Sequence, residues 1–299
     1  MSSEPSSDPP NADMKVSVNP QRAADLAENL ASILSRINTS ANSSAVSVPR
    51  LVAVSKLKPA SDILALHQPP IGSPQAHFGE NYVQELVEKS RLLPRSIKWH
   101  FIGGLQSNKA RDLARDVPNL WAVESVDSVK KAGLLDKGRG EMVKRWEDAK
   151  AEEKGEVEEG VVREKLRVFV QVNTSGEDSK SGVEPEGKEL VDMCKYVREE
   201  CDTLKLQGLM TIGAIARSQA STEETVNEDF VCLKKAREMV CKELGIEEGE
   251  LELSMGMSED FEAAVKQGSS EVRVGSTIFG ARPPKKEAKV VEQAEEAKK

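Results

Sequence analysis

The sequence contains few of the residues from which metal and redox sites are built. It has four cysteines and three histidines among 299 residues, and no two histidines stand at helical spacing. Cys194, Cys201, Cys232 and Cys241 lack the close pairing of a zinc site and lie in segments with helical periodicity. We therefore expect reduced, packed cysteines and no metal ligands.

A long apolar run and an excess of positive charge are also missing. No stretch approaches the roughly 20 apolar residues that a membrane helix needs. The first 20 residues, rich in serine and proline, resemble neither a signal peptide nor a transit peptide. The net charge of -8 argues against general nucleic-acid binding, which requires a concentrated cationic surface. These absences predict a cytoplasmic protein that binds neither membranes nor nucleic acid.

Short apolar runs alternate with longer amphipathic segments from Leu51 onward. The runs predict strands at 51–55, 76–79, 97–102, 120–124, 167–173, 206–211, 251–254 and 272–275, and the segments predict helices at 82–92, 109–115, 128–137, 186–200, 228–244 and 258–267. Such alternation gives parallel strands with right-handed crossovers, and eight units closed on themselves form a (β/α)8 TIM barrel. An open doubly wound sheet ranks lower, because residues 51–59 contain no glycine for its nucleotide-binding turn.

A single barrel domain is expected over residues 20–282. Leu26, Leu30, Ile33 and Ile37 recur at spacings of four and three, which predicts an N-terminal amphipathic helix against the barrel. Residues 1–19 are expected to be a disordered tail. Residues 137–165 read as a charged, solvated insertion that is partly helical, and 283–299 as a charged tail.

Lys56 stands directly after the first predicted strand. A lysine at the mouth of a parallel barrel can lose its proton through desolvation and attack an aldehyde. Most lysines are simply exposed, so this position gains meaning only from the other strand ends.

Two turns that combine glycine with hydroxyl groups follow the last two predicted strands. Ser254 and Ser258 flank the first turn, and Gly275 and Ser276 form the second. Backbone N–H groups, hydroxyls and a helix beginning near Ser258 can bind a phosphate dianion. Barrels often bind phosphate after strands seven and eight, so we favour this function over simple turn and cap roles.

Arg273 lies two residues before Gly275, so both point to the same side of the strand. A buried arginine at a barrel mouth needs an acceptor, and a pyridine nitrogen is a suitable one. Because guanidinium keeps its proton, such a ring nitrogen would stay unprotonated and the cofactor would be a poor electron sink. Pairing with Glu252 or Glu271 in the barrel wall is the alternative.

Several blocks of sequence, taken together, resemble the pyridoxal phosphate homeostasis protein family. They are AVSK at 53–56, HFGENYVQE at 77–85, WHFIGGLQSNK at 99–109, QVN at 171–173, SKSG at 179–182, GLM at 208–210, SMGMS at 254–258 and RVGS at 273–276. The resemblance covers residues 51–282 apart from the charged insertion. It implies a barrel like the N-terminal domain of alanine racemase, with pyridoxal 5'-phosphate (PLP) as cofactor.

The site residues implied by this resemblance are Lys56, Asn81, Ser254, Arg273, Gly275 and Ser276. Lys56 would form the Schiff base, Arg273 would face the pyridine nitrogen, and Asn81 would lie near the cofactor. Ser254, Gly275 and Ser276 would contact the phosphate.

The resemblance also implies a monomeric carrier or buffer of PLP in vitamin B6 and amino-acid homeostasis, without catalytic turnover, which could supply PLP-dependent apoenzymes. One alternative is an amino-acid racemase of the same fold. Racemisation needs acid and base groups on both faces of the substrate, and residues after 282 offer only a short charged tail. A second alternative is a sugar-phosphate enzyme in which Lys56 reacts with a substrate aldehyde.

Overall fold

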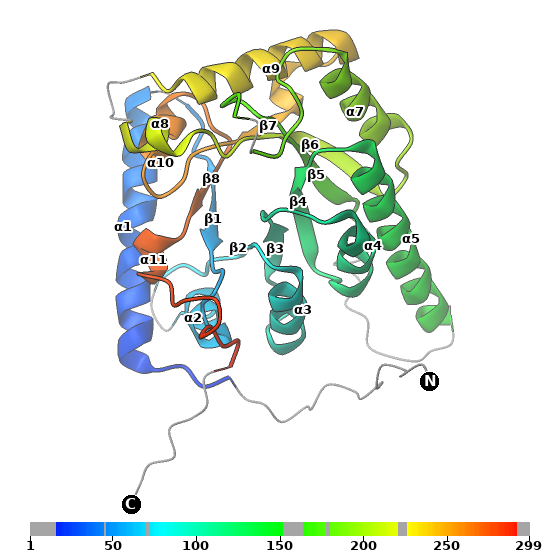
Figure 1. Cartoon of the computed structure of the whole chain (residues 1–299). Coiled ribbons are helices and arrows are strands. Elements are labelled where there is room, and N and C mark those ends of the chain that lie inside the picture. The colour runs from blue at the N-terminus through cyan, green and yellow to red at the C-terminus, as the bar shows by residue number, and fades with distance from the viewer. Residues whose placement is uncertain are drawn as a thin grey trace, which may run out of the picture.

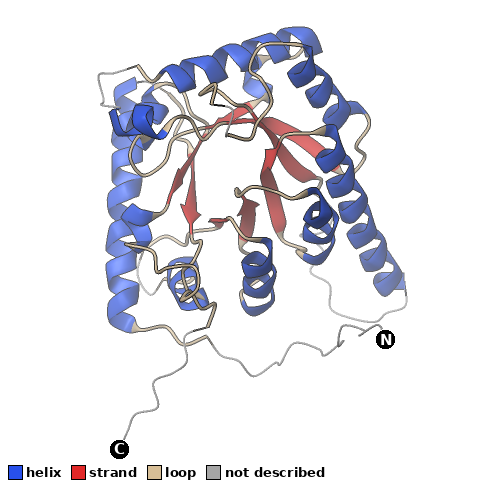
Figure 2. Ribbon diagram, in the orientation of Figure 1, coloured by secondary structure: helices blue, strands red, loops and turns tan. Residues whose placement is uncertain are grey.

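The computed structural model describes residues 16–44, 46–69, 72–151, 164–177, 180–220 and 226–291. Eight parallel strands close into a barrel in chain order (Figures 1 and 2). They are β1 (Arg50–Val54), β2 (His77–Glu80), β3 (Lys98–Phe101), β4 (Leu120–Val126), β5 (Leu166–Gln171), β6 (Leu204–Met210), β7 (Glu252–Ser254) and β8 (Glu271–Val274). The predicted TIM barrel is confirmed, and every predicted strand end lies within two residues of the observed one.

Closure of the barrel places the first and last strands side by side. In the parallel pairing of β1 with β8, Leu51 is opposite Val272 and Ala53 is opposite Val274. The strands are nearly continuous apolar runs because parallel strands are covered on both faces. The residues that follow β1 and β8 therefore meet at one mouth of the barrel.

The helices surround the barrel, with α1 along one side and α9 across the adjacent one (Figure 1). They are α1 (Pro20–Ser44), α2 (Ala60–His67), α3 (Val83–Leu92), α4 (Ser107–Asp116), α5 (Val129–Ala151), α7 (Lys188–Glu199), α8 (Ile215–Ala220), α9 (Glu228–Leu244), α10 (Phe261–Lys266) and α11 (Ser276–Phe279), with a 3-10 turn η1 (Glu248–Glu250). The expected helix at 258–267 begins only at Phe261. The sequence patterns did not indicate the short helices α2, α8 and α11.

The N-terminal helix forms as the periodicity predicts. Leu26, Leu30, Ile33 and Ile37 are all buried on one face of α1. The Asn19 side chain accepts hydrogen bonds from the first-turn amides, which begins the helix. Residues 16–19 thus belong to the folded structure, and the part of the predicted N-terminal tail at 1–15 lies outside the described residues.

The predicted insertion at 137–165 begins as ordered helix, because α5 continues to Ala151. Arg139 is 2% exposed and Met142 6%, so one face of this part of the helix packs against the protein. Lys144, Arg145, Glu147 and Asp148 are exposed on it. The Arg139 guanidinium donates to the carbonyls of Pro118 and Glu164. Residues 152–163 lie outside the described part of the chain.

The first half of the predicted C-terminal tail packs on the barrel. The carbonyl of Val290 accepts a hydrogen bond of 2.8 Å from the amide of Ala60, in the first turn of α2. The Lys285 ammonium lies 4.0 Å from the ring centre of Tyr82, a cation–π contact. Residues 283–291 therefore lie beside the loop that carries Lys56, and 292–299 are not described.

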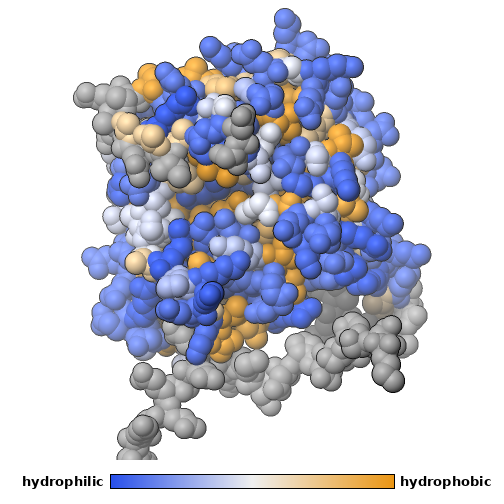
Figure 3. Space-filling model, viewed as in Figure 1, coloured by the Kyte–Doolittle hydropathy of each residue, from blue (hydrophilic) through white to orange (hydrophobic). Residues whose placement is uncertain are grey.

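Hydrophilic residues cover much of the face shown in Figure 3, with hydrophobic residues between them, in keeping with a charged fraction of 31%. Within the described ranges, no helix has the length and apolar character needed to cross a membrane.

Candidate functional site

Lys56 stands two residues beyond the end of β1, at the mouth of the barrel. It is half-buried, and its amine makes no hydrogen bond or ion pair with any described residue. Burial lowers the pKa of this amine, and the nearby Arg282 guanidinium lowers it further, against the opposing charges of Glu80 and Glu85. A larger share of the amine is therefore neutral, as a nucleophile requires.

An ion cluster whose Lys89 and Glu80 side chains are fully buried supports the Lys56 loop from behind. The Lys89 ammonium donates to Glu80 at 2.7 Å, to Glu85 at 2.6 Å and to the carbonyl of Ser55 at 2.9 Å. Glu85 also accepts from the amide of Leu57 at 2.7 Å. Leu57 has a φ of +62°, which is strained for a residue with a side chain. The cluster thus holds the two residues that flank Lys56.

Gly275 follows β8 and has no room for a side chain. A Cβ at this position would lie 2.5 Å from the Arg282 guanidinium and 3.1 Å from the carbonyl of Val54. The Gly275 amide donates to the Ser258 hydroxyl at 3.2 Å, while Ser276 is exposed and begins α11. Gly275, Ser276 and Ser258 therefore form one polar turn beside the end of β1.

Ser258 does not take the alternative role of capping α10, because that helix begins three residues later. Asp260 instead accepts from the amide of Met257, which holds the segment as a loop before the helix. The helix expected to begin near Ser258 begins at Phe261, and Ser258 lies in the preceding loop.

Arg273 points into the barrel and is 4% exposed. Its guanidinium donates to the Ser254 hydroxyl at 2.5 Å and to the carbonyl of Thr211 at 2.7 Å. The alternative pairing in the barrel wall is not observed, because Glu252 and Glu271 bind Arg50 at 2.7 and 2.8 Å.

The Ser254 hydroxyl is fully buried among charged side chains. It lies 2.7 Å from a carboxylate oxygen of Glu124 and 2.9 Å from one of Glu271, in addition to Arg273. The structure thus does not bring this hydroxyl to the turn at Gly275, where the expected phosphate contact would be. Ser254 positions Arg273, and the Ser258 hydroxyl stands at the turn in its place.

A chain of buried polar groups continues from Ser254 through the barrel. His100 Nδ1 lies 2.7 Å from Glu124, and His100 Nε2 lies 2.8 Å from His77 Nδ1. Burial lowers the pKa of His100 to about 4. Burial and the neighbouring Glu124 raise the pKa of Glu271 to about 7. Burial also raises the pKa of Glu124, so both carboxyl groups hold a proton more readily than an exposed glutamate does.

His100, Glu124 and Glu271 are the one group of three possible metal ligands found among the described residues, with ligand atoms within 4.8 Å of one another. Arg50 binds Glu271, and Arg273 lies 4.0 Å from Glu124. These guanidinium groups already supply the positive charge that a metal ion would bring.

The raised pKa of Glu271 predicts a pH-dependent stability. Because the folded protein holds this proton up to about pH 7 while the unfolded chain releases it near 4.5, stability should fall as the pH rises between these values. Glu271→Gln should reduce that fall, since glutamine stays neutral. Urea unfolding at pH 5 and pH 8 tests this, and an unchanged difference between the two values in the variant would contradict it.

Asn81 follows β2 at the same mouth. Its side-chain oxygen is buried and accepts no hydrogen bond from the described residues. Its backbone packs against Gly103, where a Cβ would overlap the Asn81 carbonyl. Asn81 thus offers an unused acceptor on a backbone that is fixed in place.

Comparison with known proteins agrees with this arrangement. The family model for the alanine racemase N-terminal domain matches residues 25–283. The pyridoxal phosphate homeostasis protein of Schizosaccharomyces pombe is 42% identical over 258 residues, which cover 86% of this chain and 93% of that protein. The human protein of the same name is 44% identical over 240 residues, 78% of this chain and 77% of that protein. The chain belongs to the pyridoxal phosphate homeostasis protein family.

Solved structures share the barrel fold. PipY of Synechococcus elongatus with PLP bound is 29% identical and has a TM-score of 0.60. The match covers 85% of this chain and 100% of PipY. Alanine racemase of Corynebacterium glutamicum is 14% identical with a TM-score of 0.59, and the match covers 87% of this chain and 62% of the racemase. The latter likeness extends to the fold alone.

The sequence patterns did not predict three sets of contacts around the candidate site. Arg282 lies beside both Lys56 and Gly275, Glu124 lies behind Arg273, and the Lys89 cluster lies behind Lys56. The charged residues Glu80, Glu85 and Lys89 at spacings of four and five were an available signal for this cluster.

Proposed function

We propose that this protein binds PLP through a Schiff base on Lys56 and carries or buffers the cofactor without turning over an amino acid. Forming the Schiff base joins the neutral lysine amine to the cofactor aldehyde and releases one water. The observation that carries the proposal is the lowered pKa of a half-buried amine at the barrel mouth, next to the turn at Gly275. Membership of the family and the PLP-bound PipY structure support it.

The residues at the mouth fit the cofactor. The amide of Ser276 and the Ser258 hydroxyl, which itself accepts from the Gly275 amide, supply donors for a phosphate group. Asn81 supplies the buried acceptor that would receive a donor from the cofactor. Arg282 places positive charge beside the same turn. We propose that Ser254 acts on the cofactor only through Arg273.

The permanent positive charge of Arg273 favours a carrier function over a catalytic one. Bound PLP supplies an electron sink whose strength depends on protonation of its ring nitrogen. The Arg273 guanidinium keeps its proton, and its contacts with Ser254 and Thr211 fix its direction. A ring nitrogen that faces this group would remain unprotonated, which weakens the sink and limits any reaction of a bound amino acid.

Titration of the purified protein with PLP tests the function. We expect a yellow absorption band that saturates at one equivalent and disappears on reduction with borohydride. No racemisation of L-amino acids should follow. Sustained turnover of any of them would favour the racemase, whereas failure to form the band would favour a sugar-phosphate enzyme.

Gly275→Ala should weaken PLP binding roughly tenfold. The added methyl group would overpack the turn proposed to hold the phosphate, at a cost of about 1–3 kcal/mol. The methyl group would displace Arg282 or the Val54 carbonyl. Gly249→Ala, where an added Cβ meets nothing within 4 Å, is the matched control and should bind normally. Equal affinity of both variants for PLP in an absorbance titration would remove Gly275 from the site.

We further propose that the protein is a cytoplasmic monomer that delivers PLP to apoenzymes. Transfer of PLP from the loaded protein to a PLP-dependent apoenzyme, faster than from an equal concentration of free PLP, would support delivery. Transfer no faster than spontaneous release would limit the role to storage.

A further inference from the structure

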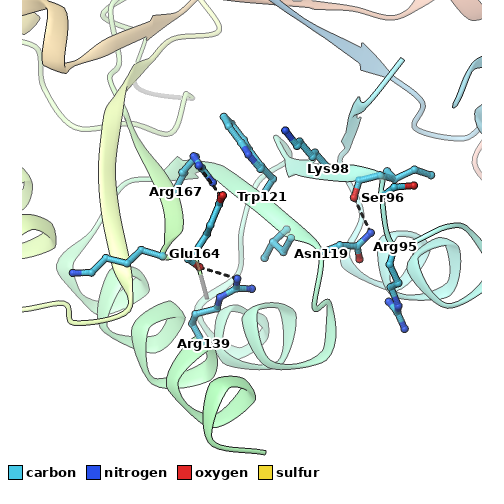
Figure 4. A pocket seen from close by; sticks show the side chains of 11 residues that line it. Arg95, Ser96, Lys98, Asn119, Trp121, Arg139, Glu164 and Arg167 are labelled. Carbon is cyan, nitrogen blue, oxygen red and sulfur yellow. Dashed lines mark hydrogen bonds and ion pairs between the residues drawn. The ribbon is translucent and has the colours of Figure 1, made fainter. Parts of the chain in front are cut away.

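A second pocket opens at the opposite end of the barrel from Lys56. It has a volume of about 180 Å³. Lys98 and Leu120 are the first residues of β3 and β4, and Lys165 directly precedes β5, so the pocket lies at the amino ends of these strands. Figure 4 shows the side chains that line it, with Glu164 between Arg139 and Arg167.

The lining of this pocket is strongly basic although the chain as a whole carries a net charge of -8. Its cationic members are Arg95, Lys98, Arg139, Lys165 and Arg167, against the single carboxylate of Glu164. Arg139 is 2% exposed, and burial together with the charge of Arg167 lowers its pKa to about 10. Like charges gathered around a partly buried space repel one another, and an anion would relieve this repulsion.

Trp121 forms one wall of the pocket, and Asn119 offers it a hydrogen-bond acceptor. The guanidinium groups of Arg50 and Arg167 lie 4.4 and 4.2 Å from the Trp121 ring, which fixes that wall. The Asn119 amide nitrogen donates to the carbonyl of Ile97 at 2.8 Å. Asn119 is 6% exposed, and its side-chain oxygen receives no hydrogen bond from the described residues. A ligand that fits would therefore donate one hydrogen bond as well as carry negative charge.

We propose that this pocket binds a small oxyanion that retains a hydroxyl group, of which monohydrogen phosphate is the simplest. Lys98 and Arg167, the latter now paired with Glu164 at 2.8 Å, donate to its charged oxygens, and the Asn119 side-chain oxygen accepts from its hydroxyl. Arg139 contributes positive charge, while its own donors hold the carbonyls of Pro118 and Glu164. Planar guanidinium groups suit such an anion because they present paired donors. This site is separate from the phosphate turn at Gly275 and does not depend on the proposed function.

Calorimetric titration of the full chain with inorganic phosphate at pH 8 tests the proposal. The double variant Lys98→Gln/Arg167→Gln should bind phosphate about tenfold more weakly, since charged hydrogen bonds are lost. Arg198→Gln/Lys242→Gln removes the same charge from exposed positions on α7 and α9 and should bind as the natural protein does. Sulfate and a phosphate monoester, which carry no hydroxyl on the anion at this pH, should bind more weakly than phosphate.

Three results would overturn the proposal. Equal binding by both double variants would show that the pocket is not the site. Loss of binding in Ser276→Asp alone would place the anion at the barrel mouth. The sequence also carries glutamates at 152, 153, 156, 158 and 159. Phosphate binding that appears only after all five are changed to glutamine would mean that these carboxylates, and not a free anion, occupy the basic pocket.

Discussion

Lys56→Ala is expected to abolish the yellow band that PLP forms with the protein, because alanine has no amine to join to the aldehyde. PLP could still be held by the turn at Gly275, so some affinity should remain without the band. Absorbance titration measures the covalent form, and equilibrium dialysis measures the total bound cofactor. The two readings should diverge in this variant and agree in the natural protein.

The other candidate lysines serve as controls for this result. Lys109 is exposed on α4, and Lys109→Ala should leave the band unchanged. Lys180 is held by the carbonyl of Gly213 at 2.6 Å and by Glu177 at 2.9 Å, so its amine is already engaged. A Lys56→Ala protein that keeps the full band would contradict the assignment and direct attention to Lys180.

Lys89→Met is expected to cause the largest loss of stability in the barrel, about 3–5 kcal/mol in the free energy of unfolding. The substitution removes a fully buried cation and leaves the fully buried Glu80 and the partly buried Glu85 without it. Burial already raises the pKa of Glu80, so the loss should be greater at pH 8 than at pH 5. Urea unfolding at both pH values provides the measurement.

Glu80→Gln, added to Lys89→Met, separates the charge effect from the packing effect. Glutamine retains the shape of Glu80 without its charge, so the double variant should recover part of the lost stability. Arg198→Gln, at an exposed position on α7, should change stability by less than about 0.5 kcal/mol. A loss below about 1 kcal/mol in Lys89→Met would show that the cluster contributes little to the folded state.

The arrangement of strands was predictable because it rests on local pattern and on barrel closure. Apolar runs such as Leu51 to Val54 mark buried parallel strands, and a closed barrel must set the first strand beside the last. The placement of the residues that follow β1 and β8 at one mouth of the barrel follows from that topology alone. The direction of Arg273 into the barrel followed from strand alternation in the same way.

The partners of Arg273 could not be predicted, because they come from distant parts of the chain. Ser254 and Thr211 stand on or beside β7 and β6, and Glu124 reaches this group from β4. The alternation of side chains along a strand shows which residues face the barrel interior. It does not show which of those side chains meet across the barrel axis. The choice of Arg50 as partner for Glu252 and Glu271 depends on the same contacts.

The short helices were missed for a different reason. In α2 six of eight residues are buried, so no amphipathic contrast marks it, and α11 spans only four residues. The extent of α5 was underestimated because its charged residues suggested solvent, whereas Arg139 is buried by bonding to backbone carbonyls. Charge density alone therefore did not show that one face of this helix, at Arg139 and Met142, packs against the protein.

The central claim is that one amine, that of Lys56, carries the cofactor. Its most direct test is to load the protein with PLP, reduce it with borohydride, digest it, and locate the modified lysine by mass spectrometry. We expect one pyridoxyl group per chain, confined to the peptide that contains Lys56. A label on Lys180 or any other lysine, or a label spread over several, would contradict the account.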